Sequence, residues 1–235
     1  MAAHSNSWAE GGYLSGKQAE SAADFQWNDG GCTSAMQSVC GQPETGGSRT
    51  ILAYYSFDDG DTADKSGNHR DGVVQGGVTI DDRGVVGKAA RFDGTGRIVV
   101  SAFRNFAWGS KFSVSVWFQR TANDGNYQGI ISNGYGGEGS WEIRMGRENG
   151  GTSLGGGVRT DRNDETWDVA NLNARVNQWH HAAIVYDGDD FHFYLDGVQT
   201  SASPDHGDIT IKPTDVFIGQ VRVIPFVDML DCSLT

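Results

Sequence analysis

Acidic and amide side chains are concentrated in one short segment, residues 58–72. The segment contains five aspartates and one asparagine, namely Asp58, Asp59, Asp61, Asp64, Asn68 and Asp71. Ca²⁺ needs hard oxygen ligands of this kind, with backbone carbonyls completing its six to eight contacts. Carboxylates at this density repel one another unless a cation lies among them. The segment is not an EF-hand, because the ordered Asp-x-Asp-x-Asp-Gly pattern with a closing Glu is absent.

Two interpretations of this segment stay open. Asp, Asn and Gly are also the residues that an ordinary solvated turn uses, because their side chains and backbones adopt turn conformations readily. We expect a structural calcium ion, with Asp64, Asn68 and Asp71 as candidate ligands from the loop.

Aromatic and arginine side chains form the second candidate site. Trp141, Trp167, Tyr127 and Tyr135 lie in or beside segments rich in Gly and Asn. Aromatic rings of this kind stack on sugar faces, while Arg and Asn can donate hydrogen bonds to hydroxyl groups. Arg144 and Arg159 lie on neighbouring expected strands and could line a concave face beside Trp141. We therefore expect Trp141, Arg144, Arg159 and Tyr135 to contact a ligand, against the alternative that Trp141 is a core residue.

The elements that must position these residues are short strands joined by turns. Expected strands cover residues 51–57, 89–92, 97–100, 112–119, 129–132, 141–145, 154–159, 180–186, 191–195, 210–211 and 216–218. Glycine-rich turns such as Asp93-Gly94-Thr95-Gly96 and Asp187-Gly188-Asp189-Asp190 separate them. No amphipathic helix longer than a turn or two follows residue 50. This pattern predicts an all-β fold, either a two-sheet sandwich or a jelly roll.

Several segments resemble the laminin-G-like family of concanavalin-type jelly rolls. They are Ala53–Asp58, Asp64–Gly72, Gly87–Gly94, Phe112–Phe118, Trp179–Gly188 and Tyr194–Gly197, and they occur in the family's order. The resemblance covers residues 50–219 and implies an antiparallel two-sheet sandwich. It also implies a structural calcium near the first loop and the last strand, with Asp64, Asn68 and Asp231 at the matching positions.

The C-terminal end departs from the family pattern, which closes with a strand that pairs with the first strand. In Phe226–Cys232, Asp228 replaces the family's Gly and Cys232 replaces its second acidic residue. We expect a short or frayed closing strand, as in a truncated chain. The resulting domain organisation is a low-complexity tail or linker over residues 1–49 and a jelly-roll domain over residues 50–235.

Carboxylate spacing argues against catalysis. Related sandwich glycosidases carry Glu-x-Asp-x-x-Glu or Glu-x-Asp-x-Glu on one strand, and neither pattern occurs here. The acidic residues 161–168 could supply the two carboxylates that a glycosidase needs, but we expect them to form a solvated loop.

His180 and His181 point to opposite faces of a strand and therefore do not share a metal. The resemblance places one of these histidines in or near the core with a hydrogen-bond partner.

Bulk composition excludes some partners. The 30 acidic residues outnumber the 18 basic ones, which gives a net charge of −12. Such a surface repels nucleic acids and anionic membranes. No apolar stretch is long enough to span a membrane, and residues 1–12 lack the pattern of a signal peptide.

The three cysteines are Cys32, Cys40 and Cys232. They are either all unpaired thiols, or the first two form a local disulfide.

Three functional hypotheses follow. The first, which we prefer, is a non-catalytic module that binds a glycan or an extracellular protein and holds calcium. The second is a glycoside hydrolase or lyase on the same fold. The third is a purely structural domain of a larger extracellular protein. The extracellular location is implied by the resemblance alone.

Overall fold

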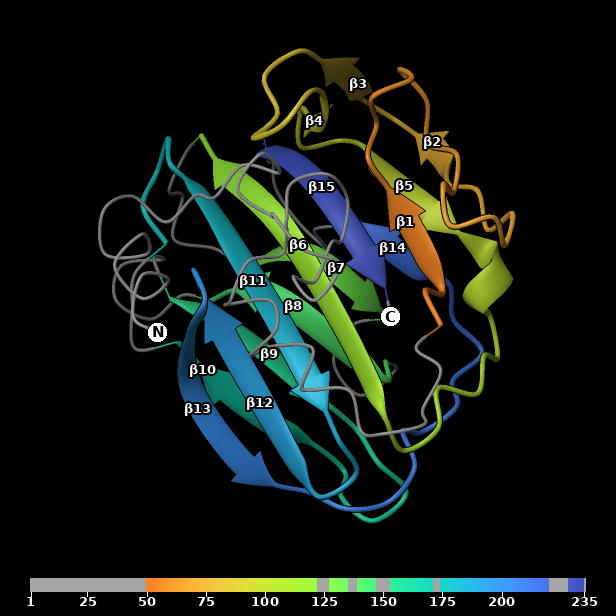
Figure 1. Ribbon diagram of the computed structural model, residues 1–235, viewed down its shortest axis with the longest axis vertical. Coiled ribbons are helices and arrows are strands. Elements are labelled where there is room, and N and C mark those ends of the chain that lie inside the picture. Colours follow the sequence, from red (N-terminus) through yellow and green to blue (C-terminus); the bar gives the residue numbers. More distant parts are fainter. Residues whose placement is uncertain are drawn as a thin grey trace, which may run out of the picture.

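The computed structural model describes residues 50–121, 127–134, 139–146, 153–170 and 174–219, together with the backbone of residues 228–234. Two antiparallel β-sheets pack face to face over this range (Figure 1). The only described helical element is a three-residue 3₁₀ turn, η2 (Ser101–Phe103). None of the helical segments in the described ranges could cross a membrane.

The first sheet contains eight strands in the order β13-β12-β11-β6-β15-β4-β3, with β1 pairing to β15. Its strands are β1 (Ala53–Tyr55), β3 (Val78–Asp81), β4 (Ala89–Phe92), β6 (Phe112–Arg120), β11 (Trp179–Tyr186), β12 (Asp190–Leu195), β13 (Val198–Pro204) and β15 (Asp228–Leu234). The long strand β6 lies between β11 and β15 at the centre of this sheet.

The second sheet contains seven strands in the order β10-β9-β8-β7-β14-β5-β2. Its strands are β2 (Val73–Gln75), β5 (Arg97–Val100), β7 (Gln128–Asn133), β8 (Trp141–Met145), β9 (Leu154–Val158), β10 (Thr166–Val169) and β14 (Val216–Ile218). Strand β14 pairs with β7 and β5, although it follows both by more than eighty residues.

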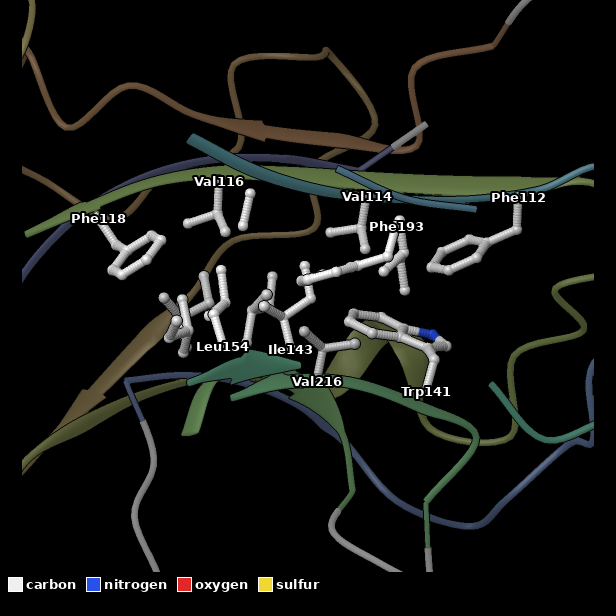
Figure 2. Packing of buried hydrophobic residues seen from close by; sticks show 14 of the residues in the cluster. Phe112, Val114, Val116, Phe118, Trp141, Ile143, Leu154, Phe193 and Val216 are labelled. Carbon is white, nitrogen blue, oxygen red and sulfur yellow. The ribbon is translucent and has the colours of Figure 1, made fainter. Parts of the chain in front are cut away.

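The core forms because apolar residues alternate along strands of both sheets and meet between them. Phe112, Val114, Val116 and Phe118 project from β6 toward Trp141 and Ile143 of β8 (Figure 2). All six side chains are at most 5% exposed. Burial of this apolar surface stabilises the sandwich by about 25 cal/mol per Å² removed from water.

The structure confirms the expected all-β sandwich and most of the expected strands. Four strands that the sequence analysis did not assign are also present: β2, β3, β10 and β13. The expectation of a strand at residues 210–211 was wrong, because only a single bridge between Thr160 and Ile209 forms there. The acidic segment 161–168, expected to be a loop throughout, enters β10 at Thr166.

The closing strand β15 pairs with three neighbours. It contacts β6 along seven residues, β4 along two and β1 along three. The backbone ladder between β1 and the closing strand is therefore present along all three residues of β1. Residues 1–49 and the three cysteine side chains lie outside the described part of the structure.

Candidate functional site

The Asp64 carboxylate closes the acidic loop by accepting backbone hydrogen bonds from three parts of the chain. Its Oδ1 accepts the N–H groups of Tyr54 and Ser66 at 3.0 and 2.9 Å, and its Oδ2 accepts the N–H of Arg70 at 3.0 Å. Burial raises the pKa of Asp64, but these hydrogen bonds lower it more, so the pKa lies below its ordinary value. Asp64 is therefore an ionised acceptor that fastens the loop to β1.

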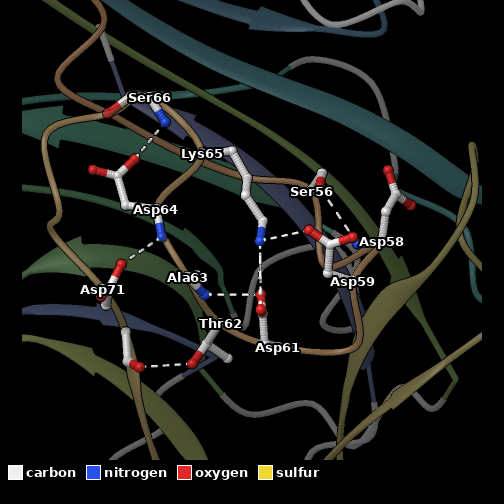
Figure 3. A network of polar contacts seen from close by, with 11 residues as sticks. Ser56, Asp58, Asp59, Asp61, Thr62, Ala63, Asp64, Lys65, Ser66 and Asp71 are labelled. Carbon is white, nitrogen blue, oxygen red and sulfur yellow. Dashed lines mark hydrogen bonds and ion pairs between the residues drawn. The ribbon is translucent and has the colours of Figure 1, made fainter.

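Lys65 supplies positive charge to the acidic loop. Its ammonium Nζ lies 2.8 Å from Asp59 and 3.1 Å from Asp61 (Figure 3). The main cause that lowers the pKa of Asp61 is the N–H of Ala63, and the Lys65 hydrogen bond adds to it. The chain itself thus provides a cation for these two carboxylates.

The other two predicted ligands in the loop also bind protein groups. Asp71 Oδ1 accepts the N–H of Asp64 at 2.9 Å. Asn68 Nδ2 donates to the carbonyl oxygens of Ile51 and Leu52 at 2.7 and 3.1 Å. Asp64, Asn68 and Asp71 lie in one loop, as expected; Asp64 and Asn68 hold the loop to β1 and the residues before it, while Asp71 binds Asp64 within the loop.

Ca²⁺ takes six to eight oxygen ligands, and carboxylate oxygens of Asp64 and Asp71 already accept hydrogen bonds from the chain. Within the ranges that the structure describes, no group of three or more His, Cys, Asp or Glu side chains could hold a metal ion. The remaining predicted ligand, Asp231, lies on β15, where the backbone alone is described and its Cα pairs with Trp117. The calcium ion stays a prediction.

The Trp141 side chain is packed in the core, as the alternative interpretation of this residue predicted, so the expectation of an exposed ring is corrected. Its side chain is 2% exposed, and its ring packs against Trp108 and Phe112 at centroid distances of 5.3 and 5.1 Å. In β8, Trp141, Ile143 and Met145 alternate with Glu142 and Arg144, and this alternation could have predicted that Trp141 and Arg144 face opposite sides.

Arg144 forms a stack with two aromatic rings on the outer face of the seven-stranded sheet. Its guanidinium carbon lies 4.4 Å from the Trp167 ring centroid and 4.8 Å from that of Tyr127. All three residues are partly exposed. We call Trp167, Arg144 and Tyr127 the arginine stack. Desolvated contacts between Arg and aromatic faces stabilise this arrangement.

Glycines of β9 make room for the Trp167 ring. A Cβ atom at Gly155 would lie 2.4 Å from Trp167 Cζ2, and one at Gly157 would lie 2.7 Å from Cε3. The indole therefore lies directly over the glycine backbone of the neighbouring strand. The Leu-Gly-Gly-Gly-Val sequence of β9, in which Gly155 and Gly157 share the outer face, is the sequence signal for this platform.

Arg159 lies next to the arginine stack in a hollow of the same face. Its Nη2 donates to Glu165 at 2.7 Å and its Nη1 donates to the Asp164 carbonyl at 2.6 Å. The hollow is lined by Gly134, Gly139, Ser140, Trp141, Glu142, Gly157, Val158, Arg159 and Glu165. Two predicted residues, Arg144 and Arg159, thus belong to this face, while Tyr135 lies outside the described residues.

The two adjacent histidines face opposite sides of β11, as expected. His180 Nε2 accepts the N–H of Arg175 at 2.8 Å, so Nδ1 carries the proton and donates to Asp196 at 2.8 Å. The prediction of one hydrogen-bonded histidine near the core is confirmed, since His180 also packs against Phe118. His181 lies beside Trp117, and burial lowers its pKa to about 4 although Asp196 raises it.

This fold and the motifs that build it define a family. The family model of the concanavalin A-like lectin/glucanases superfamily matches residues 92–223, more than half of the chain. The chain belongs to this superfamily. No curated protein matches it closely enough in sequence to assign a particular member.

Solved structures share the fold at low sequence identity. Domain 4 of an extracellular arabinanase from Geobacillus stearothermophilus, in complex with arabinotriose, is 22% identical with a TM-score of 0.61, covering 79% of this chain and 91% of that one. The binding domain of botulinum neurotoxin DC in complex with SialylT is 14% identical with a TM-score of 0.61, covering 79% and 47%.

The same toxin domain in complex with rat synaptotagmin II is 14% identical with a TM-score of 0.58, covering 79% of this chain and 48% of that one. The chain therefore spans about half the length of the toxin chains that it resembles. At these identities, the similarity describes the fold alone.

Proposed function

We propose that this protein is a non-catalytic carbohydrate-binding module whose ligand contacts the arginine stack on the outer face of the seven-stranded sheet. The observation that carries the proposal is the contact of the Arg144 guanidinium with the rings of both Trp167 and Tyr127. Ligand sites combine aromatic surface with a few fixed polar groups. Here the rings hold a guanidinium group in one orientation, so its N–H donors are presented without a large loss of side-chain entropy.

The similar solved structures suggest the first ligands to test. One of them is a complex with arabinotriose and another is a complex with rat synaptotagmin II. A glycan is favoured over a protein partner because the candidate face has buried polar groups, such as Glu142 and Ser132, between its aromatic residues. The core of a protein–protein contact is depleted in charged residues, so a carboxylate in the middle of this face disfavours a protein partner.

A glycan array followed by calorimetry tests the proposal. Trp167→Ala and Arg144→Ala should each weaken binding of the strongest glycan by roughly tenfold to a hundredfold, or about 1.4–2.8 kcal/mol. Val198→Ala is the matched control, because Val198 is 54% exposed and lies on the other sheet. Equal affinity of all four proteins, or no binding on an array that includes arabinotriose, would contradict the proposal.

Glycoside hydrolysis is the second candidate function. Its support is that Glu142 and Glu165 line the same hollow, since glycosidases use a carboxylate pair. Against it, Glu165 is ion-paired with Arg159 at 2.7 Å and Glu142 lies 3.8 Å from Arg144, so both carboxylates already contact arginines of the same face. Release of reducing sugar by the wild type, abolished in both Glu142→Gln and Glu165→Gln, would establish catalysis.

The structural calcium ion and the extracellular location remain part of the proposal. Asp64, Asn68 and Asp71 support the metal by lying in one loop beside β1, the strand that pairs with β15. A bound ion stabilises the folded state by mass action, so chelation should lower the melting temperature. A melting temperature that is the same in calcium and in chelator would remove the ion from the proposal.

A further inference from the structure

A single cross-strand row of residues runs over the whole outer face of the seven-stranded sheet. Trp167 pairs with Gly157, Gly157 with Glu142, and Glu142 with Ser132. The row continues from Ser132 to Phe217, from Phe217 to Val99, and from Val99 to Val73. Residues that are directly opposite each other in neighbouring strands share one face of the sheet. The row therefore crosses all seven strands on the face that carries the arginine stack.

Phe217 forms a second unit of aromatic and arginine side chains on this row. Its neighbours in β14, Val216 and Ile218, are completely buried in the core, so the Phe217 side chain points to the outer face. The guanidinium carbon of Arg97 lies 5.0 Å from the Phe217 ring centroid. Arg97 Nε donates to Gln75 at 3.0 Å, which fixes the guanidinium over the ring.

The residues between the two units have small or buried side chains. Gly157 has no side chain, and Ser132 and Glu142 are 8% and 6% exposed. Trp167 and Phe217 lie four strands apart, a distance of about 19 Å at 4.7–4.9 Å per strand. Val73, two strands beyond Phe217, is 61% exposed and extends the apolar surface at that end of the row. The row thus has an aromatic and arginine unit at Trp167 and another at Phe217, separated by small or buried side chains.

We infer that the ligand is a linear, neutral polysaccharide that lies across the strands and contacts both units. This inference rests on the proposed function and names the class of its ligand. The separation of Trp167 and Phe217 exceeds the reach of one sugar ring, and each unit offers an aromatic ring with an arginine donor. The Glu142 carboxylate between the two units and the net charge of −12 disfavour an anionic chain.

Calorimetric titration with arabino-oligosaccharides of increasing length tests the inference. If these do not bind, the probe is the neutral linear glycan with the strongest array signal, again as a length series. Affinity should rise with length until both units are bridged. Phe217→Ala should then weaken binding of the longest oligosaccharide by roughly tenfold, or 1.4 kcal/mol, and leave the shortest binding oligosaccharide unchanged, whereas Trp167→Ala should weaken binding at every length.

Arg97→Gln provides a second variant that keeps the folded core intact, because Arg97 is only partly buried. It should reproduce the length-dependent loss, and Val198→Ala should not. Affinity that is independent of length, or a loss in Phe217→Ala and Arg97→Gln that is the same for short and long oligosaccharides, would overturn the inference while leaving the arginine stack as a binding site. Unchanged glycan affinity in Trp167→Ala would instead contradict the proposed function.

Discussion

At the residue scale, Asp64 shows how one carboxylate stabilises a loop. It is 7% exposed and accepts N–H groups from β1 and from two points in the loop. A carboxylate with several backbone donors stays ionised, and removing it leaves those donors without their acceptor. The stabilisation is present above the ordinary pKa of an aspartate and is lost as the pH falls through the lowered pKa of Asp64.

We predict that Asp64→Ala lowers the free energy of unfolding by about 2–4 kcal/mol, because three buried or half-buried N–H groups lose a charged acceptor. Urea denaturation measures the change. Asp59→Asn is the control, since the Asp59 side chain is 71% exposed and its ion pair with Lys65 should contribute less than about 1 kcal/mol. Similar losses in the two variants would contradict the role assigned to Asp64.

His181 makes the free energy of unfolding depend on pH in a higher range than Asp64 does. Burial lowers the pKa of His181 to about 4 in the folded state, from 6.5 in the unfolded chain. Between these values, the unfolded chain binds a proton that the folded protein does not bind, so the free energy of unfolding falls as the pH falls. Full stability is present above pH 6.5, and at most roughly 3 kcal/mol is lost by pH 4.

We predict that His181→Asn is less stable at pH 7 but loses less of its remaining stability between pH 6.5 and pH 4.5. Chemical denaturation at a series of pH values gives both quantities. His206→Asn is the matched control, because the His206 side chain is 67% exposed. An unchanged pH dependence in His181→Asn would show that another group carries it.

At the element scale, the three consecutive glycines of β9 face different environments, one the core and two the candidate binding face. Gly156 faces the core, where an added Cβ would lie 2.8 Å from Ile184 and 2.9 Å from Phe193. Gly155 and Gly157 face outward beneath Trp167. A strand with so little side-chain volume lets the opposite sheet pack closely on one side and the indole on the other.

We predict opposite phenotypes for alanine at neighbouring positions of β9. Gly156→Ala should lower the free energy of unfolding by about 1–3 kcal/mol through overpacking, while the folded fraction keeps its glycan affinity. Gly155→Ala should displace the indole, change its fluorescence and weaken binding. Melting curves, fluorescence spectra and calorimetry distinguish the two, and a weaker affinity in Gly156→Ala than in Gly155→Ala would contradict this assignment.

The elements also show which parts of the fold were predictable. Strands with long apolar alternation, such as β6 and β11, were expected nearly to the residue. The missed strands β2, β3 and β13 are short or exposed, and β10 lies within an acidic segment. Their side chains carry little core pattern, so pairing with a neighbouring strand decides their structure.

At the scale of the whole molecule, the C-terminal strand holds the first sheet together. Strand β15 lies between β6 and β4 and also pairs with β1. Residues close to the C-terminus thus complete a sheet whose other strands begin at residue 53. Pairings between distant parts of the chain slow folding, because the entropy cost of loop closure precedes the contacts that repay it.

We predict that removing residues 228–235 prevents cooperative folding, because it leaves β6, β4 and β1 without their shared partner and exposes three strand edges. Circular dichroism and size-exclusion chromatography measure the loss. Substituting residues 2–9 with Gly and Ser is the control. A cooperative melt in the shortened chain would show that the first sheet does not depend on β15.

The sequence by itself determined the class of fold, because alternating apolar residues between glycine turns can bury a core only as stacked sheets. It also determined the superfamily and the loop that contains Asp64, Asn68 and Asp71, since these residues are close along the chain. It indicated four aromatic residues with Arg144 and Arg159 as a candidate ligand face, but it selected Trp141 and Tyr135 and not Trp167 as the aromatic contacts.

Only the tertiary structure decided that Trp141 is buried and that Trp167 lies over the glycines of β9. It also decided that Lys65 supplies charge to the acidic loop and that Trp167 and Phe217 share one row. The physical reason is that strand order and register place residues from distant segments side by side. The alternation within one strand says which residues share a face, but pairing with other strands says what that face contains.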